Sequence, residues 1–156
     1  MIAIDAPGWG RRQIEHVVLD FNGTLACDGR LLAEAEELLA RLSIKARVHL
    51  CSADHYGTVA DETRRFDLAL KVLKGANHAE EKMEFVRRLG PLQVAAVGNG
   101  SADTQMLREA ALGICVVGPE GACPQTLVAA DVVCVSITEA LGLLLHPGRL
   151  AATLRR

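Results

Sequence analysis

Short apolar runs alternate with segments of helical period along most of the chain. Five runs have strand length: HVVLDF (16–21), RVHLCS (47–52), VAAVG (94–98), GICVVG (113–118) and VVCVS (132–136). They are nearly continuous in apolar residues rather than alternating, which is typical of strands buried on both faces. Helices are predicted after them, at 31–42, 57–65, 79–89, 103–110, 123–130 and 138–145, and a sixth short run lies at 68–73. This order predicts an α/β fold, a Rossmann-like three-layer sandwich with a mostly parallel sheet.

The first twenty residues break this pattern. MIAID and QIEHVV flank PGWGRR, in which Pro7, Gly8 and Gly10 predict a turn. We therefore expect an extra hairpin at one edge of the sheet, at about residues 1–20. A length of 156 residues suits one domain, residues 1–156, and neither repeats nor linkers interrupt it.

The composition excludes several classes of function. No apolar stretch reaches the length of a membrane span, and MIAIDAPGWG has an early acid and no basic lead, so we expect neither an anchor nor a signal peptide. The net charge is −2, the arginines lie in scattered pairs and aromatic residues make up 3% of the chain, which argues against nucleic acid as a partner. The five cysteines form no CxxC pair, which favours a reducing cytoplasm.

Polar residues stand where three of the predicted strands end: Asp20, Ser52 and the pair Gly98-Asn99. The carboxyl ends of parallel strands form one edge of the sheet, where ligands bind, so we expect these residues to converge. Asp20 alone could equally form a turn or cap a helix. The Asn22-Gly23 turn and Thr24 that follow it would aim a carboxylate, a carbonyl and several N–H groups at one point.

Four segments resemble, in order, the motifs of the haloacid dehalogenase (HAD) superfamily. DFNGTL (20–25) resembles DxDGT and a hydrophobic residue, with Asn22 in the second acidic place. LCS ends at Ser52 as the second motif does, Lys82 matches the motif lysine, and GNGSAD (98–103) resembles GDGxxD. Over most of its length the chain is most similar to small soluble proteins related to the phosphorylation domain of P-type ATPases. The resemblance implies a HAD-like fold, and the short spacing between motifs leaves no room for a cap domain.

The resemblance also implies roles for these residues. Asp20 would be the nucleophile that forms an aspartyl-phosphate, and Mg²⁺ would offset the repulsion between carboxylate and phosphate. Lys82, or Lys74 as the alternative, would offset charge in the transition state. The predicted catalytic residues are Asp20, Asn22 and Lys82; the phosphate-binding residues are Asp20, Gly23, Thr24, Ser52, Ala53 and Lys82; the magnesium ligands are Asp20, Asn22, Asn99 and Asp103.

Two residues depart from the superfamily pattern. In its phosphatases the acid two residues after the nucleophile protonates the leaving group and later activates water, and the amide of Asn22 does neither. Asn99 removes a second negative charge from the metal site, where it would be a neutral ligand or a partner of one. Both replacements also occur in the soluble relatives that the chain resembles. His55, close after Ser52, is a candidate proton donor, and no histidines have zinc-ligand spacing.

The resemblance predicts a cytoplasmic, Mg²⁺-dependent phosphatase or phosphotransferase of modest turnover. The alternative is a non-catalytic or weakly catalytic module that binds a phosphorylated ligand, a metal or a partner in the same pocket. A dehalogenase would use Asp20 against carbon without a metal. Because a site without a cap stays open to bulky ligands, the predicted partner is a phosphorylated small molecule or a phosphoprotein. A second copy of the chain could cover the pocket, which predicts a homo-oligomer.

Overall fold

A six-stranded sheet forms the centre of the molecule in the computed structural model, which describes residues 1–156. Its spatial order is β10 (Val132–Cys134), β9 (Leu112–Val116), β8 (Val94–Gly98), β3 (His16–Leu19), β6 (Arg47–Ser52) and β7 (Ala69–Val72). Every neighbouring pair is parallel. The four inner strands, β3, β6, β8 and β9, are buried on both faces over most of their length, as their continuous apolar sequences predict, whereas the edge strands β7 and β10 are partly exposed.

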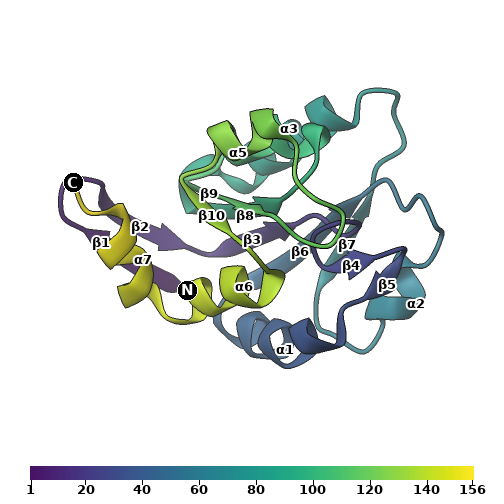
Figure 1. The fold of residues 1–156 in the computed structure, drawn as a ribbon, viewed down its shortest axis with the longest axis horizontal. Helices are drawn as coiled ribbons and strands as arrows, with labels where there is room; N and C mark the ends of the chain where they lie inside the picture. The colour runs from purple at the N-terminus through teal and green to yellow at the C-terminus, as the bar shows by residue number, and fades with distance from the viewer.

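Helices cover both faces of this sheet (Figure 1). On one side lie α3 (His78–Leu89), α4 (Thr104–Glu109) and α5 (Pro124–Ala129); on the other lie α1 (Glu36–Lys45), α2 (Val59–Thr63) and α6 (Ile137–Leu145). Short 3₁₀ turns precede three elements, at Ala33–Ala35, Pro91–Gln93 and Ser101–Asp103. The predicted three-layer α/β architecture is confirmed, with no inserted cap domain. None of the helices combines the length and apolar character that crossing a bilayer requires.

The N-terminal hairpin differs from its prediction. Its strands β1 (Ile2–Ala6) and β2 (Gly10–Ile14) pair only with each other, as a separate two-stranded sheet. The chain then enters the central sheet, where 16–19 form the central strand β3 rather than part of the hairpin. The inward residues of β1 are covered by α7 (Pro147–Leu154), a helix that the sequence pattern did not predict. Only Leu150 and Leu154 of this helix are buried, and two positions are too few to show a helical period in the sequence.

A second small hairpin, also unpredicted, follows β3 at the carboxyl-end edge of the sheet. It pairs β4 (Ala26–Cys27) with β5 (Arg30–Leu31). Gly29 lies in its turn at φ +75°, and a side chain there would lie 2.7 Å from the Cβ atom of Tyr56. The hydroxyl of Thr58 donates to the carbonyl of Gly29 at 2.6 Å. These contacts fasten the hairpin to the loop before α2.

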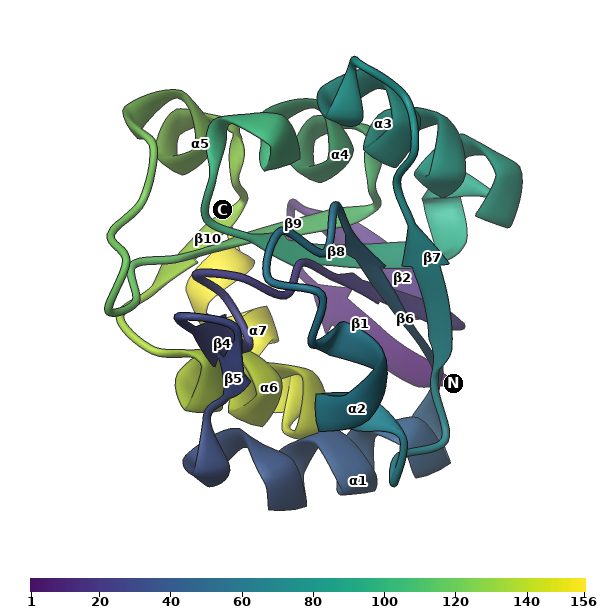
Figure 2. The same cartoon turned by 90° about the vertical axis from the view of Figure 1, so that its right-hand side faces the viewer.

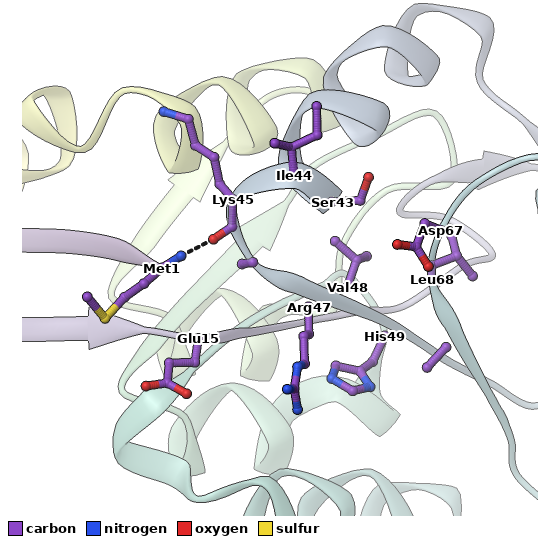
Figure 3. Close-up of a pocket in the computed structure, with 12 residues that line it drawn as sticks. Met1, Glu15, Ser43, Ile44, Lys45, Arg47, Val48, His49, Asp67 and Leu68 are labelled. Carbon is purple, nitrogen blue, oxygen red and sulfur yellow. Dashed lines mark hydrogen bonds between the residues drawn. The ribbon is translucent and has the colours of Figure 1, made fainter.

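An open hollow of about 610 Å³ lies at the opposite, amino-end edge of the sheet (Figure 3). It is lined by Met1, Glu15, Ser43, Ile44, Lys45, Ala46, Arg47, Val48, His49, Asp67, Leu68 and Ala69. In Figure 3 the N-terminal amine of Met1 points to the carbonyl of Lys45, with which it is hydrogen-bonded. None of the predicted site residues lines this hollow.

Two histidines on neighbouring strands contact each other beside this hollow. The Nδ1 atom of His16 lies 3.0 Å from Nε2 of His49, and the His49 ring meets Phe85 of α3 edge to face. Burial lowers the pKa of His49 to about 4, and the charges of His16 and Arg47 add to the effect. The sequence showed no such pairing, because the two residues are far apart along the chain and have no metal-ligand spacing.

We expect His49 to make the fold sensitive to acid. The unfolded chain binds a proton at this imidazole near pH 6.5, whereas the folded chain does so only near pH 4. The contribution of the neutral His49 imidazole to the free energy of unfolding is therefore full above pH 6.5. It is lost as the pH falls toward 4, by up to about 3 kcal/mol. The difference between the free energies of unfolding of wild type and His49→Gln, measured in urea between pH 4 and 7.5, should grow toward neutral pH. Groups common to both proteins cancel in this difference, and a difference independent of pH would contradict the prediction.

Candidate active site

The strand order reverses between β3 and β8, and the predicted residues gather at that point. The chain proceeds from β3 to β6 and β7 on one side, then crosses to β8, β9 and β10 on the other. Asp20 follows β3 directly and Asn99 follows β8, both at the carboxyl-end edge that Figure 2 faces. Such a reversal leaves a crevice between the diverging loops, which is where open α/β sheets bind ligands.

The turn after β3 closes against the loop after β8. Gly23 has φ +80°, and a Cβ atom there would lie 2.4 Å from Nδ2 of Asn99, so only glycine fits. The hydroxyl of Thr24 lies 3.2 Å from Oδ2 of Asp20 and 3.1 Å from Oδ1 of Asn99. It has one proton and donates to one of them at a time. Thr24 thus orients the Asp20 carboxylate from behind.

Asp103 is held by the loop that it terminates. Its Oδ2 accepts the backbone N–H groups of Asn99 at 3.0 Å and of Gly100 at 2.9 Å. A Cβ atom at Gly98 would lie 2.5 Å from Cγ of Asp103, which explains why glycine ends the strand. The spacing of GNGSAD therefore has a physical cause: it folds the loop back so that its last carboxylate faces Asp20.

Lys82 joins the two carboxylates. It extends from α3, its side chain is only 4% exposed, and its Nζ lies 2.6 Å from Oδ1 of Asp20 and 2.6 Å from Oδ1 of Asp103. Burial alone would lower the pKa of Lys82, but the two carboxylates outweigh it and hold that pKa above its usual range. Lys82 therefore stays an ammonium. Two carboxylates and one ammonium leave this buried cluster one negative charge in excess when both acids are ionised.

The protonation of Asp20 is shifted by its surroundings. Burial raises the pKa of Asp20 to about 6, the neighbouring Asp103 adds to the rise, and Lys82 opposes it. A protonated carboxyl is a poor nucleophile. A second cation beside Asp20 would favour its ionised form over a wider pH range.

The residues present fit a magnesium ion. The groups available are oxygens, from the Asp20 and Asp103 carboxylates and the turn at Asn22, which is the donor type that Mg²⁺ prefers. The Oδ1 atom of Asn22 is buried without a hydrogen-bond partner, and a cation or a ligand donor would satisfy it. The amide of Asn99 is already held at both ends, by Thr24 and by the carbonyl of Gly121 at 3.0 Å. Its contacts favour a positioning role over direct ligation.

A cavity of about 310 Å³ opens over this cluster. It is lined by Asp20, Asn22, Ser52, Ala53, Leu73, His78, Lys82, Asn99, Gly100, Ser101, Ala102, Asp103 and Glu120. The cavity is smaller than the hollow of Figure 3, but its charged groups Asp20, Lys82 and Asp103 are bonded to one another. Ser52 uses its oxygen to accept the N–H of Asp54 at 3.0 Å, so its own proton remains available for a ligand.

The structure thus brings together most of the predicted residues and separates a few. Gly23 and Thr24 lie behind Asp20 rather than in the cavity wall. Lys74, the alternative to Lys82, is exposed and outside the cavity. His55 is also exposed and outside it.

Asp54, which the sequence places near the site beside His55, has a structural role, and two residues of the cavity wall were not singled out from the sequence. Asp54 accepts the N–H of Val59 at 3.1 Å, at the start of α2. His78, Ser101 and Glu120 line the cavity, and no sequence motif pointed to His78 or Glu120.

Comparison with known proteins supports the fold and supplies one sequence relative. No protein-family model matches the chain. An uncharacterized protein of Methanocaldococcus jannaschii, MJ0073, is 48% identical over 63 residues, which cover 40% of this chain and 68% of that protein. The 3-deoxy-D-manno-octulosonate 8-phosphate phosphatase of Moraxella catarrhalis, solved with magnesium, phosphate and KDO, superposes with a TM-score of 0.69 at 17% identity, covering 91% of this chain and 94% of that one.

A second solved structure gives the same result. A protein of Legionella pneumophila described as a HAD superfamily subfamily III A hydrolase has a TM-score of 0.71 at 16% identity, over 90% of this chain and 87% of that one. At such low identity these structures establish the fold. The chain therefore belongs to the family of the Methanocaldococcus jannaschii protein MJ0073, and its fold is that of the HAD superfamily phosphatases.

Proposed function

We propose that this protein is a magnesium-dependent phosphatase or phosphotransferase that forms an aspartyl-phosphate on Asp20. The observation that carries the proposal is the contact of one buried lysine with two carboxylates at the floor of an open cavity, at the point where the strand order reverses. The solved phosphatase of the same fold with magnesium and phosphate supports it.

The protein's own groups account for the first half-reaction. Ser52 and Lys82 would bind phosphoryl oxygens, since both point hydrogen-bond donors at the cavity. Thr24 keeps one oxygen of Asp20 oriented while the other attacks phosphorus. A bound Mg²⁺ would supply positive charge between the nucleophile and the phosphate dianion. The phosphorus–oxygen bond to the leaving group breaks, and the phosphoryl group is then covalently attached to Asp20.

The substrate is a phosphorylated small molecule or a phosphoprotein. The Moraxella protein of the same fold is a phosphatase for a small sugar-acid phosphate. The cavity here has no cap domain above it. Glu120 and His78 are among its lining residues, and the β4–β5 hairpin reaches it only through the hydrogen bond from the Asp28 N–H to Glu120. Because the mouth is open, a phosphorylated side chain of another protein can also reach the cavity.

A screen of phosphate esters, anhydrides and acyl phosphates with Mg²⁺ tests the proposal, together with trapping by beryllium fluoride. Turnover of at least one class and Mg²⁺-dependent trapping are expected. Trapping without turnover would instead favour a module that senses a phosphorylated ligand. The absence of both trapping and turnover would contradict the proposed phosphoenzyme.

Asn22→Asp is expected to accelerate selectively the two steps that need proton transfer, which are the departure of a poor leaving group and the hydrolysis of the phosphoenzyme. General acid and base help is worth ~10²- to 10⁴-fold, and an amide in this place cannot provide it. Wild type should therefore favour aryl phosphates, acyl phosphates and anhydrides, and should show a burst followed by slow dephosphorylation. The variant should gain on alkyl phosphates and lose the burst, as measured by stopped-flow and steady-state rates. An unchanged alkyl-to-aryl ratio with intact Mg²⁺ binding would argue that another group already serves.

A further inference from the structure

The first turn of α3 places an imidazole at the mouth of the cavity. Because α3 connects two parallel strands, β7 and β8, it begins at the carboxyl-end edge and runs back toward the amino-end edge (Figure 2). His78 is its first residue and Lys82 lies one turn deeper. Residues four apart on a helix share a face, with Cβ atoms roughly 6 Å apart. His78 is half-buried and lines the same cavity as Asp20.

The start of this helix is well defined. The side-chain oxygen of Asn77 accepts the N–H of Glu80 at 3.2 Å, which caps the first turn. The position of the His78 backbone is therefore set by the helix rather than by a flexible loop.

The other ionisable groups of the cavity already have interaction partners. Lys82, Asp20 and Asp103 bind one another, and none of the hydrogen bonds of this cluster engages His78. Glu120 lies on an exposed loop across the mouth, where its carboxylate accepts the N–H of Asp28 at 2.9 Å. An imidazole can both donate and accept a proton, as acid and base catalysis require.

We infer that His78 supplies part of the general acid and base help that Asn22 cannot give, so that a carboxyl group introduced by Asn22→Asp would still add to it. The inference rests on the proposed function and deepens it. As the Asp20 oxygen bonds to phosphorus, the bond from phosphorus to the leaving oxygen breaks, and that oxygen takes the proton of the His78 imidazolium. In the second half-reaction the neutral imidazole takes a proton from water while the water oxygen bonds to phosphorus. The bond from phosphorus to Asp20 then breaks, which releases phosphate and restores both groups.

His78→Asn tests this inference in the full-length protein with Mg²⁺. The ratio of kcat/KM for an alkyl phosphate to that for p-nitrophenyl phosphate should fall by ~10²-fold, because only a poor leaving group needs the proton. The rate of phosphoenzyme decay after the burst should fall as well. His55→Asn is the matched control, since His55 is exposed and outside the cavity. Circular dichroism and beryllium fluoride trapping verify that the fold and the nucleophile are intact.

Two further measurements separate the possible results. Asn22→Asp added to His78→Asn should restore the ratio, because it supplies a carboxyl group in place of the lost imidazole. A ratio unchanged by His78→Asn in an active protein would overturn the role of His78 and leave the proposed function standing. A selective loss in Glu120→Gln instead would also overturn it and assign the proton to Glu120. A wild type that neither turns over nor traps phosphate mimics would overturn both proposals.

Discussion

Asp20→Asn is expected to lose turnover by at least ~10⁴-fold, with loss of the trapped phosphoenzyme and retention of the fold. The amide cannot attack phosphorus, whereas Lys82 keeps its contact with Asp103, so no buried charge is left unpaired. Steady-state rates on the best aryl phosphate and ¹⁹F NMR of the beryllium fluoride complex measure the effect. Because burial raises the pKa of Asp20 to about 6, the variant should also unfold at the same temperature as wild type or slightly higher near pH 7.

Asp28→Asn provides the matched control for this substitution. Asp28 is exposed on the turn between β4 and β5, and the hydrogen bond that it makes to Glu120 uses its backbone N–H. Its conversion to asparagine should change neither turnover nor trapping. Activity of Asp20→Asn within about tenfold of wild type would be incompatible with a covalent role for Asp20.

Lys82→Met is expected to destabilise the protein by about 3–5 kcal/mol at pH 8, besides abolishing activity. Without the ammonium, Asp20 and Asp103 are two buried carboxylates facing one another. Urea unfolding of the metal-free protein measures the loss. Lys74→Met is the control, because that lysine is exposed and outside the cavity.

The pH dependence of this loss has a definite sign. Burial and Asp103 already raise the pKa of Asp20 above its unfolded value, and removal of Lys82 raises it further. A group whose pKa is raised by folding stabilises the native state fully below its unfolded pKa and loses that contribution as the pH rises through the folded pKa. The cost of Lys82→Met should therefore be smaller at pH 5 than at pH 8. Adding Asp20→Asn should recover most of it, and a double variant as unstable as Lys82→Met would show that packing, not charge, is responsible.

The central sheet and its helices could be predicted because their signals are local. The continuous apolar runs at β6 and β8 and the helical period of α3 are repeated over whole segments, so the sequence reports them directly. The positions of Asp20, Ser52 and Asn99 at strand ends also followed, because the ends of parallel strands must lie at one edge. The predicted boundaries differ from the structure mainly at element ends, where packing decides how far a helix or strand continues.

Elements that depend on distant partners were not predictable in the same way. The helix α7 exists because β1 offers it an apolar face, and the β4–β5 hairpin is held by Thr58 and Tyr56 from another segment. The sequence of each is too short to show a period of its own.

The sequence alone determined which groups could perform chemistry: the acid after β3, the lysine on α3 and the glycine-flanked loop that ends at Asp103. Only the tertiary structure decided how these groups interact. It placed Lys82 at 2.6 Å from both carboxylates, paired His16 with His49 and brought His78 to the cavity. The physical reason is that charge coupling and burial act over a few ångströms in space, whatever the separation along the chain. Motif order specifies residue types, whereas the protonation of Asp20 and the access of His78 depend on packing between segments that the motifs do not describe.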